Sequence, residues 1–190
     1  MSFLKRLFGT ENTARCEPPQ SAWGAISEKI ATDFQNHRTN WFAHCVEIVQ
    51  SRWKAIPNPR LAGEVEMVAK VYQCVWAFHF LGQQEYIRPE NGKNFTALLF
   101  HRVCAGEAIN ACQQTLMRLS NNLAAGKGDD NFFMASRVAE AIAFTESPLE
   151  ETMAIMPTLL DFTVVTYAIV ANAFGDSATF HKLMMERSKR

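Results

Sequence analysis

The sequence predicts an all-α protein, built as a single-domain up-down helical bundle of five main helices plus a short C-terminal helix. Four observations support this fold class. Apolar side chains recur at the three- and four-residue spacing of helices along most of the chain. Residues 153–174 are apolar around nearly the whole circumference of a helix, and no stretch alternates apolar and polar residues as a half-buried strand does. The 190 residues are enough to bury one substantial core.

We expect residues 148–174 to form the central helix. Within the segment MAIMPTLLDFTVVTYAIVANAF, Asp161 is the only charged residue, so the helix must be buried in lipid or in protein. Acidic residues before the segment and basic residues after it favour a membrane-spanning orientation. Against this, Pro157, Asp161 and Asn172 interrupt the apolar run and share one narrow stripe. We therefore predict burial at the centre of the bundle, with Asp161 partly solvated at the edge of the core.

Residues 1–18 are predicted to form an amphipathic tail and linker, and residues 19–190 the helical-bundle domain. The apolar side chains of the tail surround two basic residues, which makes it a candidate for weak peripheral contact with a membrane surface or a protein partner. These apolar side chains are Phe3, Leu4, Leu7 and Phe8. Two turns bury too few side chains to bind alone, which favours a frayed terminus instead.

The first helix of the bundle is expected over residues 21–55, where apolar positions step mostly by three, four and seven. The polar residues 35–40 are poor helix formers and predict a kink or break there. Pro57 and Pro59 end this helix. The second helix, over residues 60–87, carries two apolar stripes and should therefore contact two neighbours.

The third helix is expected over residues 94–123, because its seam positions step 4-3-4-3-4-3-4, a spacing typical of near-antiparallel bundle packing. A glycine-rich loop then leads to a shorter helix over residues 131–145. Ser147 and Glu150 match a capping box, which gives Glu150 a structural role at the start of the central helix. Gly175 closes the central helix, and a short helix follows it.

Composition excludes several classes of protein. Nineteen basic and nineteen acidic residues give a net charge of zero, so nothing favours binding to nucleic acid. The five cysteines lack paired spacing, and four of them lie in predicted helices beside apolar residues, which favours small buried thiols kept reduced in a cytosol. The opening residues lack the apolar core of a secretory signal, and we expect a cytoplasmic location.

Catalytic and cofactor motifs are missing from the sequence. It contains no Gly-x-Ser-x-Gly elbow, no complete phosphate loop and no Glu-x-x-His pair of the kind found in di-iron bundles. His101 and Cys104 are spaced as two metal ligands on one helix, but a structural zinc ion needs four. We expect no catalytic residue, no metal and no cofactor.

Polar residues on otherwise apolar helix faces are the candidates for a ligand site. His79 and Arg102 take such positions on the second and third helices, and buried polar groups require partners. They either pair and fix the helix register, or they form the polar floor of a pocket ringed by aromatic side chains. We expect His79 to be uncharged near neutral pH. The candidate ligand-binding residues are His79, Arg102, Gln83, Trp76, Tyr72 and Trp41.

The sequence therefore favours a non-enzymatic cytosolic protein that acts by binding a protein partner or by self-association as a homo-oligomer. The alternative is a bundle that binds a small molecule or cofactor, with or without catalysis, through a pocket lined by His79, Arg102 and nearby aromatic residues. The two alternatives predict different surfaces. A partner-binding module should expose a continuous apolar patch, whereas a pocket protein should contain a cavity with converging polar groups.

Overall fold

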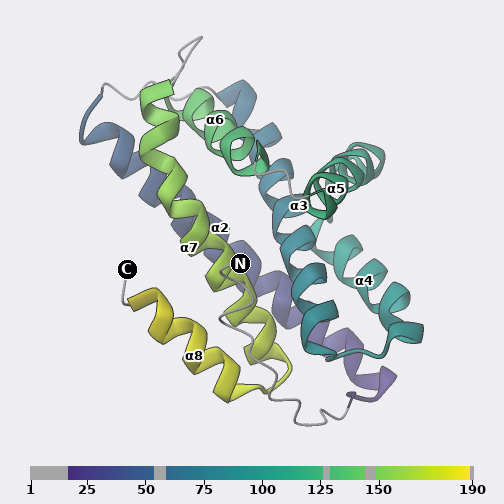
Figure 1. The fold of residues 1–190 in the computed structure, drawn as a ribbon. Coiled ribbons are helices and arrows are strands. Elements are labelled where there is room, and N and C mark those ends of the chain that lie inside the picture. The colour runs from purple at the N-terminus through teal and green to yellow at the C-terminus, as the bar shows by residue number, and fades with distance from the viewer. Residues whose placement is uncertain (1–16, 54–58, 126–128, 144–148, 189–190) are drawn as a thin grey trace.

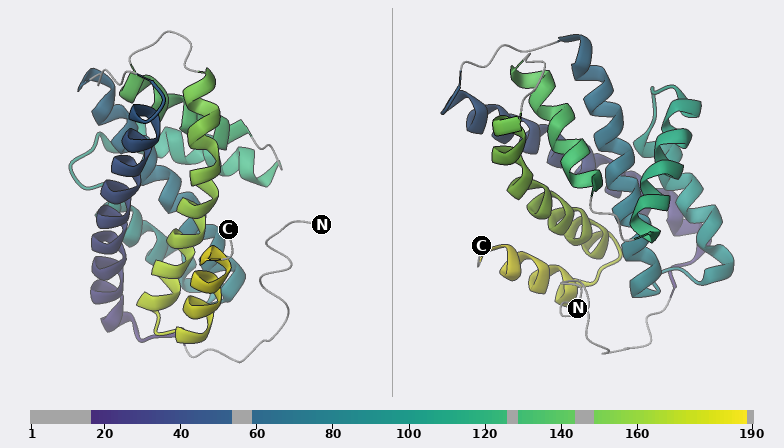
Figure 2. Two further views of the ribbon diagram at one scale, coloured as in Figure 1. Left: turned by 90° about the vertical axis from the view of Figure 1, so that its left-hand side faces the viewer. Right: turned by 45° about the horizontal axis from the view of Figure 1, so that its top comes forward.

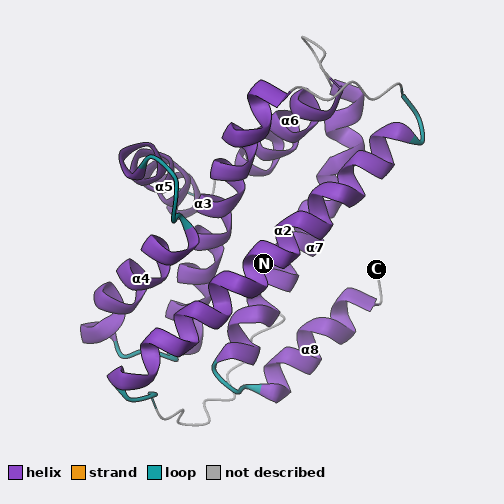
Figure 3. Cartoon of the chain, turned by 180° about the vertical axis from the view of Figure 1, so that it is seen from behind, coloured by secondary structure: helices purple, strands orange, loops and turns teal. Residues whose placement is uncertain are grey.

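Helices account for nearly all of the chain that the computed structural model describes, which is residues 17–53, 59–125, 129–143 and 149–188 (Figures 1 and 3). The predicted all-α class and single helical body are confirmed, because the helices of these ranges pack against one another and include no strand. The described elements are η1 (Gln20–Ala22), α2 (Trp23–Gln50), α3 (Pro59–Gln84), α4 (Pro89–Val103), α5 (Ile109–Ala124), α6 (Asp129–Ala143), α7 (Leu149–Ala173) and α8 (Ser177–Ser188).

Helix α7 is the central element, as the apolar segment predicted. It contacts α2, α3, α6 and α8, with α6 beside its first half and α8 beside its second half (Figures 1 and 2). Among the described helices, α7 alone is long and apolar enough to cross a membrane by length and composition. Much of its surface is nevertheless buried against the other helices, so it forms the centre of the core. Its buried residues are Glu151, Thr152, Ile155, Leu159, Phe162, Thr163, Val164, Thr166, Tyr167, Ala168, Val170 and Ala171.

Asp161 lies at the edge of this core, partly solvated as predicted. Its side chain is 37% exposed and pairs with Arg187 of α8, whose Nε lies 2.9 Å from both carboxylate oxygens. The pair joins the end of α8 to the middle of α7. Because both side chains reach water, this pair contributes little to stability and mainly fixes where α8 ends.

The prediction of one long third helix over residues 94–123 is wrong, because the structure has two helices, α4 and α5, joined by residues 104–108. We refer to residues 104–108 as the bend. Gly106 in the bend has a φ of +83°, a left-handed conformation that glycine adopts without the steric cost of a Cβ. Helix α4 also begins earlier than expected, at Pro89, where proline suits the first position of a helix.

The kink predicted at residues 35–40 is also wrong, because α2 is uninterrupted from Trp23 to Gln50. Two residues in and beside this polar segment, Arg38 and Trp41, are buried against the rest of the bundle. Their tertiary contacts outweigh the weak helix propensity of the neighbouring residues. The predicted tail with Phe3, Leu4, Leu7 and Phe8, and Ser147 of the predicted capping box, lie outside the described residues.

The bend determines which part of α2 is covered. Helix α4 runs parallel to the first half of α2, with the Trp23 and Phe95 rings 5.9 Å apart and Arg102 paired with Glu28 further along both helices. After the bend, α5 packs against α3 and α6 instead of α2 (Figure 1). A straight continuation of α4 would have stayed beside α2, so the bend moves the chain away from α2.

Replacing Gly106 by alanine should lower the free energy of unfolding by about 1–2 kcal/mol, because a Cβ disfavours the left-handed conformation. No neighbouring atom lies within 4 Å of the added Cβ, so the cost arises from the backbone alone. Gly82→Ala in α3 is the matched control, since its Cβ also meets nothing, and it should be neutral or stabilising by up to about 1 kcal/mol. Urea unfolding measures the free energy of unfolding of both variants. Equal values for the two would contradict the left-handed conformation of Gly106.

Candidate functional site

A cavity of about 190 Å³ lies between α2 and α3, beyond the point where α4 ends. Four of its lining residues are apolar and two are charged, an arrangement typical of binding sites, whose few polar groups orient the bound group. We refer to it as the Arg38 cavity. Its lining residues are Arg38, Trp41 and Phe42 from α2, and Val65, Glu66 and Ala69 from α3.

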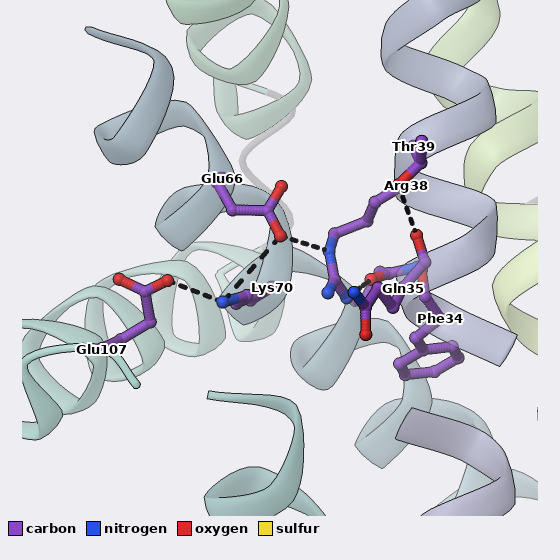
Figure 4. A network of polar contacts seen from close by, with 8 residues as sticks. Phe34, Gln35, Arg38, Thr39, Glu66, Lys70 and Glu107 are labelled. Atoms are coloured by element: carbon purple, nitrogen blue, oxygen red, sulfur yellow. Dashed lines mark hydrogen bonds and ion pairs between the residues drawn. The ribbon is translucent and has the colours of Figure 1, made fainter. Parts of the chain in front are cut away.

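Arg38 is the centre of a polar network at this cavity (Figure 4). Its Nε donates to Oε1 of Glu66 at 3.1 Å, and its Nη1 donates to Oε1 of Gln73 at 2.7 Å. Gln73 is itself fully buried and donates to the carbonyl oxygen of Phe34 at 3.4 Å. Arg38 is only 4% exposed, and a buried guanidinium is costly unless it is paired and hydrogen-bonded. These partners therefore hold Arg38 in one position in the cavity wall.

The network continues to the bend through Lys70 (Figure 4). The Nζ of Lys70 donates to Oε1 of Glu107 at 2.6 Å and lies 3.9 Å from Oε1 of Glu66. Glu107 belongs to the bend, so the change of chain direction brings an acidic group to α3. The two cations, Arg38 and Lys70, are matched by the two carboxylates. The network thus offers polar groups without a net charge that would select an ionic ligand.

Trp41 forms an aromatic wall of the cavity and is fixed by α7. Its indole Nε1 donates to Oγ1 of Thr158 at 2.8 Å, and its ring lies 4.6 Å from that of Phe162. Thr158 in turn donates to the carbonyl oxygen of Ile155 at 2.8 Å. Because each polar group in this series of hydrogen bonds has a partner, the wall is already formed before any ligand binds.

The other predicted ligand-binding residues have partners elsewhere in the bundle. His79 is half-buried, with its Nε2 2.9 Å from Nε2 of Gln83, and burial lowers the pKa of His79 as expected. Arg102 pairs with Glu28 of α2. Tyr72 donates to Asn131 at 2.6 Å, and its ring lies 6.0 Å from that of Trp76. Of the predicted set, Trp41 is the member that lines the Arg38 cavity.

Sequence reasoning missed Arg38 and Glu66. Arg38 lies within the polar segment that predicted a break, although a signal for its burial was present. It falls between Phe34 and Trp41 at the 4-3 spacing of the apolar face of α2, and Cys45 continues that spacing. All four of these residues are buried. Glu66 carried no comparable signal, because its position on α3 depends on how α2 and α3 lie against each other.

Cys45, Cys74, Cys104 and Cys112 are free thiols, and all four are buried, as the sequence predicted. Burial raises the pKa of the Cys45 thiol to about 12, so it stays protonated at neutral pH. Cys104 lies in the bend, where a hydrogen bond with Cys74 lowers its pKa. In the part of the chain that the structure describes, no group of three or more His, Cys, Asp or Glu side chains is placed to hold a metal ion.

The chemistry available at the Arg38 cavity is hydrogen bonding and apolar contact. Arginine stays protonated in proteins, and here the Glu66 carboxylate accepts from it. No protein-family model, curated protein or solved structure matches the chain.

His37 lies on α2, next in sequence to Arg38, and faces α7. Its Nε2 is 3.3 Å from the carbonyl oxygen of Phe162, which can only accept, so we assign the ring proton to Nε2. The imidazole also stacks on the Phe162 ring, with centroids 4.7 Å apart. Burial lowers the pKa of His37 from 6.5 to about 4, and Arg187 and Arg38 also disfavour the charged ring. His37 is therefore neutral at neutral pH.

The free energy of unfolding should fall as the pH drops from 6.5 toward 4, because the unfolded chain binds a proton on His37 that the folded chain does not. His37→Gln keeps an N–H donor and cannot titrate, so it should lose part of this pH dependence. His44→Gln is the control, since His44 is exposed on the same helix. Urea unfolding across this pH range measures the slopes. A His37→Gln slope equal to that of the unchanged protein would contradict the burial of His37.

Proposed function

We propose that this protein is a non-enzymatic binding protein whose Arg38 cavity receives one apolar side chain of a protein partner. A cavity with polar groups is the feature expected of a small-molecule pocket, but the size of this apolar-walled cavity, about 190 Å³, favours a single partner side chain and carries the proposal. An apolar cavity of about 150 Å³ takes up benzene, whereas sites for drug-sized ligands span roughly 300–1,000 Å³. A group the size of one aromatic or large aliphatic side chain therefore fits.

The rigidity of the cavity supports the same proposal. Trp41 is held by Thr158, and Arg38 is held by Glu66 and Gln73, so little ordering of the wall accompanies binding. Side chains that insert into small, well-packed pockets contribute most of the binding free energy in many protein interfaces. A preformed pocket for one such side chain is suited to this role.

The polar lining favours binding over catalysis. The Glu66 carboxylate already accepts a hydrogen bond from Arg38, and Lys70 lies beside it. These groups offer hydrogen bonds at the rim of an apolar pocket. Their charges balance, so the partner group is expected to be neutral and binding should depend only weakly on salt.

A small-molecule ligand is the second candidate, and the buried Arg38 with its converging partners favours it. This version differs from the predicted pocket, because His79 pairs with Gln83 and Arg102 pairs with Glu28. Native mass spectrometry of the purified protein separates the candidates. A compound retained at one per chain would support the small-molecule ligand, and its loss in a variant that fills the Arg38 cavity would locate it there.

The cavity is tested with N-acetyl-L-phenylalanine amide, which presents a single benzyl group. Titration followed by ¹H–¹⁵N NMR should shift the backbone amides of the lining residues. Ala69→Leu, which adds volume to the buried α3 wall, should weaken binding at least about tenfold, because the added side chain takes up the space of the probe. Ala97→Leu, at an exposed position of α4, is the matched control and should bind as the unchanged protein does.

Two charged analogues extend this test. Phenethylamine and N-acetyl-L-phenylalaninate should bind within about threefold of the neutral probe, because the two cations and two carboxylates of the network cancel. Circular dichroism confirms that each variant is folded. The proposal fails if the lining amides do not shift, or if Ala69→Leu remains folded and binds the neutral probe as well as the unchanged protein.

A further inference from the structure

An exposed apolar stripe runs along the first half of α7. Leu149 and Met153 are each 57% exposed and Leu160 is 45% exposed, which makes them three of the five large apolar side chains exposed on the described surface. Met156 lies between them and is partly buried. The four residues are spaced 4-3-4, so they share one face of the helix. We refer to these four residues as the α7 stripe.

The α7 stripe points away from the bundle and from the Arg38 cavity. Thr158 marks the opposite side of α7, because its hydroxyl accepts from Trp41 of α2. At 100° per residue, Met153 and Leu160 lie roughly 140–160° around the helix from Thr158. Helices α6 and α8 run beside α7 and leave this outer face uncovered along its first half (Figures 1 and 2).

We propose that the α7 stripe pairs with the same stripe of a second copy of this chain, with the two α7 helices antiparallel. The 4-3-4 spacing reads the same in both directions. An antiparallel second copy therefore sets Leu149 opposite Leu160 and Met153 opposite Met156. A two-fold contact requires such self-complementarity, because each copy uses the same patch of surface. This surface is independent of the proposed cavity function, since it lies on the other side of α7.

Charge at one flank of the stripe fits the same pairing. Glu150 is exposed beside one end of the stripe, and Asp161, paired with Arg187, lies on the same flank at the other end. A two-fold axis perpendicular to the antiparallel helices places the same flank of both α7 helices on one side of the dimer. The beginning of the stripe in one copy then lies beside its end in the other. Glu150 of each copy then lies within about one helical turn of Arg187 in the other. A guanidinium carries five N–H donors, so Arg187 can bind Glu150 while it keeps Asp161.

The area of the stripe sets the strength of this contact. Its exposed apolar surface is on the order of 300 Å² per copy, comparable to the largest patch on a typical monomer. A stable interface buries roughly 800 Å² per partner, so the dimer is expected to be weak and to depend on concentration. The exposed Glu150 opposes contact with an anionic membrane surface, which favours the second copy as the occupant.

Sedimentation velocity from about 10 µM to 1 mM should show a reversible monomer–dimer equilibrium for the unchanged protein. Met153→Glu places like charges near the two-fold axis and should weaken the dimer at least about tenfold. Met117→Glu on α5 is the matched control, because Met117 is 66% exposed but lies outside the stripe, and it should leave the equilibrium unchanged. A monomer at every concentration would overturn the proposal.

Disulfide trapping tests the orientation separately. Mixing Leu149→Cys with Leu160→Cys under mild oxidation should give a crosslinked pair that each variant alone does not form. The two Leu149 positions of an antiparallel pair lie about 16 Å apart, well beyond the reach of a disulfide. The unchanged protein under the same oxidation accounts for its native thiols. Equal crosslinking of Leu149→Cys with itself would overturn the antiparallel arrangement. Stripe-dependent binding to phosphatidylcholine vesicles by a protein that stays monomeric would overturn the proposed occupant.

Discussion

The burial of α7 is the constraint on which the rest of the bundle depends. Its segment from residue 153 to residue 174 carries a single charge, and an exposed helix of that composition would bring a large apolar surface into contact with water. Helices α2, α3 and α6 cover its inner sides, and α8 folds back along its second half, where Arg187 meets Asp161. Because α7 is buried, its buried polar side chains need hydrogen-bond partners within the protein. Thr163 and Thr166 are buried and donate to the carbonyl oxygens of their own helix.

The bend after α4 is the second determinant of the architecture. It allows α4 to cover the first half of α2 while α5 covers α3. The segment that the sequence predicted as one helix therefore packs against two different helices. It also explains why the charged network lies where it does, because Glu107 reaches Lys70 only once the chain has left the line of α4. The contact between Glu107 and Lys70 is thus a consequence of one change of direction, centred on a glycine with a positive φ.

Much of the fold could be predicted from local spacing. The 3.6-residue period identified the helical class, the central helix and the edge position of Asp161, because these properties depend on one helix at a time. The bend was not predicted, since the apolar seam continues through residues 104–108 and Gly106 alone marks the interruption. The site was largely missed for a different reason. His79 and Arg102 both occupy seam positions, but only the relative placement of α3 and α4 decides whether they meet. Trp41 was identified because its own helix face already indicated burial.

Because Cys104 lies in the bend, chemical modification of its thiol can report how often the bend opens. Cys104 is 2% exposed and its thiol is hydrogen-bonded to Cys74, so a thiol reagent cannot reach it while the bend is closed. Alkylation of Cys104 therefore requires the segment to open, and when opening is rare and reversible the modification rate reports the free energy of that local opening. The chain thus contains an internal measure of how often residues 104–108 separate from α3, independent of global unfolding.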